Sequence, residues 1–171
     1  MRFTQWFHTD CIATVYDTKV FSKKHWDMIE KFAKMAVRNG INMLLAPIFT
    51  PPLDTKVGGE RPTVQLVAIE KKKGEYFFDF TNFRKYVKIC LENGVEAFEI
   101  SHFFTQWGAK HAPKIMAYVN GEYKRIFGWD TDSASEEYAS FLKSYLMELK
   151  VFLKDMDLED KILFHISDEP N

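Results

Sequence analysis

Two stretches of the sequence repeat one pattern, in which a helical segment ends at Asn-Gly and passes directly into an apolar strand. They are VRNGINMLLAP at residues 37–47 and LENGVEAFEIS at residues 91–101. Glycine commonly ends a helix because it adopts the left-handed backbone conformation without strain. Near-continuously apolar strands are typical of sheets that are covered on both faces. Repetition of this joint therefore predicts successive β/α units, whose right-handed crossovers form a parallel sheet.

The rest of the chain follows the same alternation of strands and helices. Besides the two strands in the repeated joints, at residues 41–47 and 95–102, a first strand is predicted at residues 5–13 and a last one from Lys161 onward. Apolar residues at helical spacing predict three helices between them, at residues 22–40, about 81–94 and about 133–154.

Two insertions interrupt the predicted units. A β-hairpin insertion is expected at about 63–80, around a Lys-Lys-Gly turn, and an aromatic loop insertion without a clear period at about 103–130. Both follow strands, so the loops after strands are long and those after helices are short. This asymmetry is typical of the active face of a (β/α)8 barrel.

We therefore predict an α/β chain of the (β/α)8 TIM-barrel type that contains about four β/α units. A whole barrel usually needs roughly 250 residues, whereas this chain has 171. Residues 1–171 are then either the N-terminal portion of a barrel catalytic domain or a sheet that stays open.

Composition excludes several classes of protein. Hydrophobic residues make up 46% of the chain and the formal net charge is −1 without blocks of like charge, which argues against disorder and against a dominant nucleic-acid interaction. No stretch approaches the roughly 20 apolar residues of a membrane span. Cys11 and Cys90 are too few for a disulfide framework. Residues 1–10 lack the apolar run of a signal peptide, which leaves the compartment of a longer parent protein open.

The alternation of side chains along a strand predicts which residues face the barrel axis. In the last strand the apolar set Ile162, Phe164 and Ile166 is expected to face helices, and in the third strand Glu99 is expected to point inward. The inward set of the last strand is then Leu163, His165, Ser167 and Glu169. Across the sheet, the predicted polar mouth consists of Asp10, Ser101, Ser167 and Glu169. Because burying unpaired polar groups is costly, this mouth indicates a ligand site.

The adjacent carboxylates Asp168 and Glu169 follow the last strand, where Pro170 stops it. Their α-carbons are only about 3.8 Å apart, so the two groups compete for ionisation and one is expected to hold a proton at neutral pH. By alternation Glu169 projects over the axis and is the better general acid, whereas Asp168 needs the strand to bend. The structural alternative is that Asp-Glu-Pro is only a polar exit from the strand.

The segment His165-Ile166-Ser167-Asp168-Glu169-Pro170 resembles the HxSDEP signature of glycoside hydrolase family 123, bacterial barrel proteins that include β-N-acetylgalactosaminidases. The segment Phe49-Thr50-Pro51-Pro52, after the second predicted strand, also agrees with the general layout of that family. The resemblance implies substrate-assisted retention, in which the 2-acetamido oxygen of the substrate attacks the anomeric carbon. It further implies that Glu169 protonates the leaving oxygen and then activates water, and that Asp168 holds the acetamido N–H.

Further candidates for substrate contact lie near these acids or in the aromatic loop. Trp107 and Trp129 could stack on sugar faces or could instead fix the insertion in place. The whole set of predicted substrate-binding residues is His8, Asp10, His102, Trp107, Trp129 and His165. No cofactor is predicted. A metal site of His8, Asp10, His102 and His165 fits poorly, because His8-x-Asp10 does not match the paired histidines of metallohydrolase barrels.

The favoured hypothesis is a fragment of a retaining hydrolase of N-acetyl-β-hexosaminides, with β-linked N-acetylgalactosamine as the first candidate sugar. Two alternatives stay open, namely a non-catalytic carbohydrate-binding or assembly protein on a barrel scaffold and a metal-dependent barrel hydrolase. Families of this kind complete the sugar pocket from the other half of the barrel, so the isolated chain is expected to be inactive. Exposed sheet edges are also expected to favour self-association.

Overall fold

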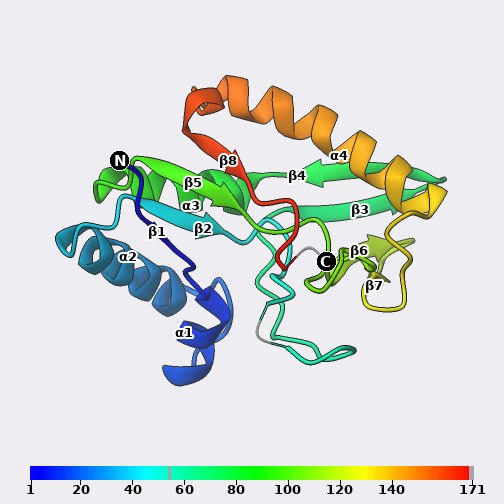
Figure 1. The fold of residues 1–171 in the computed structure, drawn as a ribbon, viewed down its shortest axis with the longest axis horizontal. Coiled ribbons are helices and arrows are strands. Elements are labelled where there is room, and N and C mark those ends of the chain that lie inside the picture. The colour runs from blue at the N-terminus through cyan, green and yellow to red at the C-terminus, as the bar shows by residue number, and fades with distance from the viewer. Residues whose placement is uncertain (54, 170–171) are drawn as a thin grey trace.

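The computed structural model describes residues 1–53 and 55–169, which form two four-stranded sheets, four α-helices and one short 3-10 helix, η1 (Glu159–Lys161) (Figure 1). The first sheet has the order β1-β2-β5-β8 and every pairing in it is parallel. Its strands are β1 (Thr4–Gln5), β2 (Met43–Ala46), β5 (Ala97–Ile100) and β8 (Ile162–Phe164). The predicted α/β class and parallel sheet are confirmed.

Three long helices connect these strands. They are α2 (Lys23–Arg38), α3 (Thr81–Glu92) and α4 (Glu136–Asp155), close to the predicted ranges. The Ser22 hydroxyl accepts a hydrogen bond from the His25 amide and the Ser135 hydroxyl one from the Tyr138 amide, which satisfies amides that the first helical turn leaves free. None of the helices in the described part of the chain combines the length and apolar character required to cross a membrane.

The predicted first strand at residues 5–13 is wrong beyond its first residue, Gln5, because β1 ends there. After β1 the chain turns into α1 (Thr9–Val15), which packs on α2. Thr9, Ile12 and Ala13 are buried, and this spacing of three and four residues suits one face of a helix. Because this segment packs on α2 as a helix, the predicted strand does not form there. Asp10 therefore does not lie on the strand face that the sequence predicts.

The second sheet has the order β4-β3-β6-β7. Strands β3 (Ala68–Lys72) and β4 (Glu75–Asp79) form the predicted hairpin, and β6 (Ile115–Val119) and β7 (Glu122–Phe127) form another one within the range expected to be an aromatic loop. Asn120 and Gly121 have φ values of 52° and 86°, as a two-residue hairpin turn requires. Strand β6 then pairs in parallel with β3, so the two insertions join into one sheet.

An aromatic core joins the two sheets. Helix α4 packs against β4 (Figure 1), and its fully buried Tyr145 lies 4.9 Å from Phe49, after β2, and 5.4 Å from Phe78 in β4, between ring centroids. All four residues of β2 and of β5 are buried as well. Most of the phenylalanine content is therefore core, and it holds the C-terminal ends of the parallel strands in place.

The apolar side of β8 is only partly covered. Phe164 lines a groove beside α4 together with Leu149 and Leu153, so its predicted direction toward a helix is confirmed. The side chain is nevertheless 45% exposed, and Ile166 is 49% exposed. Phe164 belongs to β8, the edge strand of the first sheet, and Ile166 follows it; the described residues provide no further strand beside β8. The apolar face of β8 is therefore directed toward α4 but only partly buried.

Candidate active site

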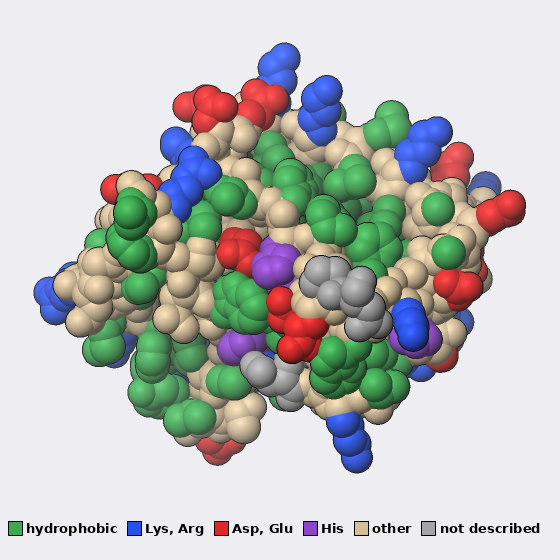
Figure 2. Space-filling model, in the orientation of Figure 1, with side chains coloured by type: hydrophobic (Ala, Val, Ile, Leu, Met, Phe, Trp, Pro, Cys, Tyr) green, Lys and Arg blue, Asp and Glu red, His purple; other side chains and the backbone are tan. Residues whose placement is uncertain are grey.

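A pocket of about 410 Å³ lies where the C-terminal ends of the parallel strands meet. Its lining comes from the segments after β1, β2, β5 and β8, in agreement with the position of ligand sites in parallel α/β sheets. The lining residues are Trp6, Leu53, Thr55, Lys56, Gln106, Trp107, Asp168 and Glu169. Figure 2 shows acidic and histidine side chains together near the centre of one face, among hydrophobic side chains.

The segment after β8 is tied to the loop after β5. The Ile166 carbonyl accepts hydrogen bonds from the amides of Phe103 and Phe104 at 3.2 and 3.3 Å, and the Glu169 carbonyl accepts one from the Gly108 amide at 3.3 Å. Glu169 has a φ of 49°, in the left-handed region that few residues other than glycine adopt. The chain therefore bends at the acids, and Asp168 lines the same pocket as Glu169 despite starting on the opposite strand face.

His165 stands between two carboxylates. Its Nδ1 atom lies 2.8 Å from Oε1 of Glu99, and its Nε2 atom lies 3.9 Å from Oδ1 of Asp168. The same Glu99 oxygen accepts a hydrogen bond of 2.9 Å from the Trp6 indole N–H. Glu99 is only 8% exposed, so its charge is compensated by these two contacts rather than by bulk water. The inward direction predicted for Glu99 and His165 agrees with this contact.

His102 packs on His165 at 4.2 Å between ring centroids and meets the edge of Trp6 at 5.7 Å. It is fully buried, and neither ring nitrogen has a hydrogen-bond partner among the described residues. Burial lowers the pKa of His102 to about 4, with a further contribution from neighbouring His165. His102 is therefore uncharged near neutral pH, and its ring forms a neutral wall beside His165.

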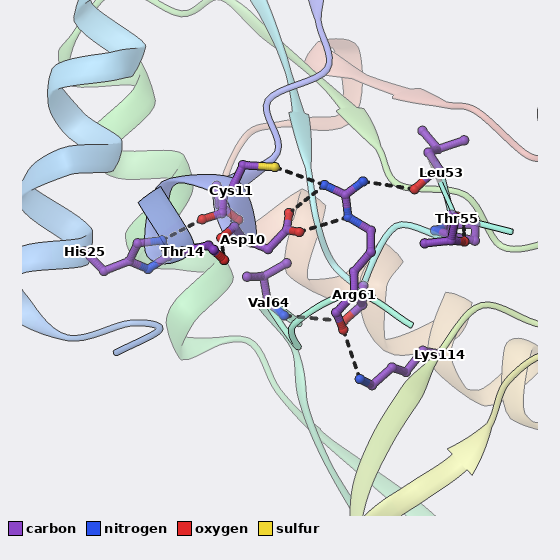
Figure 3. A network of polar contacts seen from close by, with 12 residues as sticks. Asp10, Cys11, Thr14, His25, Leu53, Thr55, Arg61, Val64 and Lys114 are labelled. Carbon is purple, nitrogen blue, oxygen red and sulfur yellow. Dashed lines mark hydrogen bonds and ion pairs between the residues drawn. The ribbon is translucent and has the colours of Figure 1, made fainter. Parts of the chain in front are cut away.

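The carboxylate of Asp10 forms an ion pair with Arg61. Its Oδ2 accepts from Nε of Arg61 at 2.9 Å and its Oδ1 from Nη2 at 3.2 Å (Figure 3). Arg61 also donates to the Leu53 carbonyl, at 3.0 Å, and Leu53 lines the pocket. Asp10 is 3% exposed, so the structure places it behind the pocket wall, where it anchors the loop after β2. Direct substrate contact by Asp10 remains a prediction.

The predicted aromatic residues lie beside the pocket. Trp107 lines it and is 43% exposed, and its ring stacks against Trp129 at 6.5 Å between centroids. The Trp129 indole N–H donates to the Gly59 carbonyl at 2.9 Å, which fixes the pair to the loop after β2. Trp107 thus offers a surface to a ligand, whereas Trp129 supports it from behind.

His8 precedes α1 and lines a different, largely apolar groove beside β1 and α2. Of the predicted site residues, the structure brings Asp168, Glu169 and Trp107 into one pocket, with His165, His102 and Trp129 directly adjacent. Among the described residues there is no group of three or more His, Cys, Asp or Glu side chains arranged to hold a metal ion.

Sequence reasoning did not select Trp6, Gln106 or Glu99 as site residues. For Glu99 a signal exists, because it is the one charged residue within the otherwise apolar strand Ala97–Ile100. Trp6 could not be found in this way, since its partner Glu99 lies 93 positions away in the sequence. Only the pairing of β1, β2 and β5 brings the two together.

Comparison with known proteins agrees with this arrangement. The model of the family described as glycoside hydrolase 123, catalytic domain, matches residues 6–171. Among solved structures, the chain is similar to a family 123 glycoside hydrolase from Clostridium perfringens that was studied for the details of glycolipid glycan hydrolysis, with a TM-score of 0.71 and 14% sequence identity. The match covers 94% of this chain but 28% of that chain. A search of curated proteins finds no match.

Proposed function

Because the chain belongs to the family of glycoside hydrolase 123 catalytic domains, we propose that it provides the two catalytic carboxylates of a retaining, substrate-assisted hydrolase of N-acetyl-β-hexosaminides. The first candidate sugar is β-linked N-acetylgalactosamine. The observation that supports this most strongly is that Asp168 and Glu169 line one pocket together with the aromatic rings of Trp6 and Trp107. Sugar rings present apolar faces that such aromatic side chains can cover, while their hydroxyl groups need polar partners.

In this proposal Glu169 is the general acid and base. Its carboxyl group donates a proton to the glycosidic oxygen while the acetamido oxygen of the substrate attacks the anomeric carbon, so the bond to the leaving group breaks as a cyclic oxazolinium forms. The Glu169 carboxylate then takes a proton from water, whose oxygen attacks the same carbon and reopens the ring. Two inversions at this carbon give net retention.

Asp168 has a separate role in the proposal. As a carboxylate it accepts a hydrogen bond from the acetamido N–H and balances the positive charge that develops on the ring. A nucleophilic carboxylate would have to approach the sugar from the side opposite the acid, about 5–5.5 Å away from it. Adjacent residues that line the same pocket suit orientation of the acetamido group better, and this supports the substrate-assisted route.

We further propose that the parallel sheet is the N-terminal half of a (β/α)8 barrel. The strand order β1-β2-β5-β8 runs in chain order with parallel pairing throughout, as it does around such a barrel. Both edges carry apolar grooves, one of about 470 Å³ that includes Phe7 and Phe32 beside β1, and one of about 200 Å³ that includes Leu149 and Phe164 beside β8. Further β/α units would cover these surfaces.

The test is the Glu169→Gln variant of the full-length protein that contains this chain. We expect kcat on an aryl N-acetyl-β-galactosaminide to fall by roughly 10²–10⁴-fold, the usual contribution of a general acid or base. The loss should be greater for a glycan leaving group than for nitrophenol, since nitrophenolate departs without a proton. Affinity for the free sugar should be retained.

A matched control is Glu92→Gln, because Glu92 is an exposed carboxylate in α3, away from the pocket. It should leave kcat unchanged. If Glu169→Gln alters neither activity nor binding, the enzyme proposal fails and a carbohydrate-binding role takes its place.

A further inference from the structure

Glu99 is a buried carboxylate in a strand that is otherwise apolar. All four residues of β5 are buried, and Glu99 lies between Phe98 and Ile100. Removing a carboxylate from water is costly unless it is paired and hydrogen-bonded. An apolar residue would be less costly in a strand that only supports the fold, so the carboxylate at this position indicates a functional role.

The contacts of Glu99 lead to the catalytic pair through His165. One ring nitrogen of His165, Nδ1, is 2.8 Å from Glu99, and the other, Nε2, is 3.9 Å from Asp168. A carboxylate beside one imidazole nitrogen fixes the proton on that nitrogen and fixes the ring orientation. With Nδ1 beside Glu99, the nitrogen that faces Asp168 is Nε2, and a proton on Nε2 would be directed at the Asp168 carboxylate.

The neighbours of this group limit where positive charge can reside. His102 stacks on His165, and burial keeps the pKa of His102 near 4. Near neutral pH His102 therefore places no positive charge beside His165. Trp6 contacts both members of the Glu99–His165 pair, because its indole N–H donates to the same Glu99 oxygen and its ring lies 5.5 Å from that of His165.

We propose that Glu99 is a positioning residue, which acts through His165 to hold Asp168 as an oriented carboxylate for the acetamido group. This role rests on the proposed function. Glu99 does not itself line the pocket, so it contributes without touching the substrate. Its contribution is greatest when positive charge develops on the acetamido group, and it should therefore affect kcat more than KM.

The experiment is a double-mutant cycle in the full-length protein, with Glu99→Gln and Asp168→Asn alone and combined. Glutamine keeps an oxygen for Trp6 and His165 but removes the charge. Glu99→Gln alone is expected to lower kcat by roughly 10- to 100-fold, the range seen for residues that act through a bound group, with KM changed less than about threefold. In the Asp168→Asn background the same substitution should cost less than about twofold, because its target is gone.

Two further variants separate this role from a general effect on folding. Glu96→Gln, at an exposed position just before β5, is the matched control and should leave kcat unchanged. Glu99→Asp keeps the charge but withdraws it by one methylene, and it should give a smaller loss of kcat, again only when Asp168 is present. If Glu99→Gln does not fold, Glu99→Asp still tests whether Glu99 acts through Asp168.

The outcomes distinguish the two proposals. Equal losses in both backgrounds, or full activity of Glu99→Gln, would overturn the positioning role and leave the catalytic carboxylates unaffected. Absence of N-acetylhexosaminidase activity in the wild-type full-length protein would instead overturn the proposed function, and the role of Glu99 with it.

Discussion

Two buried carboxylates, Asp10 and Glu99, lie outside the lining of the candidate pocket, and each contacts a basic side chain. Both oxygens of Asp10 accept from Arg61, and Arg61 in turn donates to a backbone carbonyl. Glu99 uses one oxygen for Trp6 and His165, and His165 faces a second acid, Asp168, at 3.9 Å. The contacts of Asp10 lead to Arg61 and a backbone carbonyl, whereas those of Glu99 continue through His165 to Asp168 in the pocket.

The difference shows how polar groups that support a fold can be told from those that serve a ligand. A structural carboxylate is satisfied within the protein, since an unpaired buried group lowers stability. Around His165 the satisfaction is incomplete: His102 has two buried ring nitrogens without a partner among the described residues, and Asp168 is open to the pocket. We therefore expect the Asp10 side to govern stability and the Asp168 side to govern activity.

The largest expected effect is on stability, in the Asp10→Asn variant. The substitution removes the carboxylate charge that pairs with the largely buried Arg61 side chain, and breaking a buried pair in this way typically costs about 3–5 kcal/mol. Denaturant unfolding measures the loss. Asp27→Asn is the matched control, because the Asp27 pair with Lys23 is exposed and such pairs contribute at most about 1 kcal/mol. Equal stability of the two variants would contradict a structural role for the Asp10 pair.

The Asp168→Asn variant should show the opposite behaviour. Its kcat on an N-acetyl-β-hexosaminide is expected to fall roughly 10²–10³-fold, as when one preorganised electrostatic partner of a transition state is removed. The free energy of unfolding should stay within about 0.5 kcal/mol of wild type, since Asp168 has no close buried partner to lose. A large fall in stability with unchanged kcat would reverse the comparison between the two sides.

A smaller effect is expected from pH, through His102. Its pKa is lowered to about 4 in the folded protein, whereas in the unfolded chain it is near 6.5. Above the unfolded value both states are neutral. As the pH falls from about 6.5 toward 4, only the unfolded state gains the proton, so stability decreases, by at most ~3 kcal/mol from this residue. Unfolding midpoints of wild type and His102→Gln, compared over this range, should converge at low pH. Parallel curves would count against the neutral buried ring.

Much of the site could be predicted from the sequence because its signals are local. The acids Asp168 and Glu169 follow a short apolar strand directly, and alternation correctly turned Glu99 and His165 to one side. The bend that brings Asp168 into the pocket is different, because the hydrogen bonds of residues 166 and 169 run to the loop after β5, about 60 positions earlier in the sequence. For the position of the acids and the direction of Glu99 and His165, a few adjacent residues contain the information, whereas the bend needs the loop after β5.

The predictions fail where contacts between residues distant in sequence determine the local structure. Residues 9–15 satisfy both the alternation of a strand and the spacing of a helix, and packing on α2 selects the helix. Arg61 offers no sign in the sequence that it pairs with Asp10, which lies 51 positions earlier. The hairpin at Asn120-Gly121 is a different case, since Asn-Gly between strand-forming residues is a strong local signal that the aromatic composition of the loop obscured.

The most direct test of the account is the dependence of kcat on the basicity of the substrate's N-acyl oxygen. A series of aryl 2-acylamido-2-deoxy-β-galactosides with acetyl, fluoroacetyl, difluoroacetyl and trifluoroacetyl groups changes this oxygen without changing the leaving group. If the acyl oxygen is the nucleophile, kcat of the full-length enzyme falls steeply with each fluorine, and the Asp168→Asn variant loses part of that dependence. Equal rates along the series would show that the acetamido group does not take part, and would contradict the substrate-assisted route and the role assigned to Asp168.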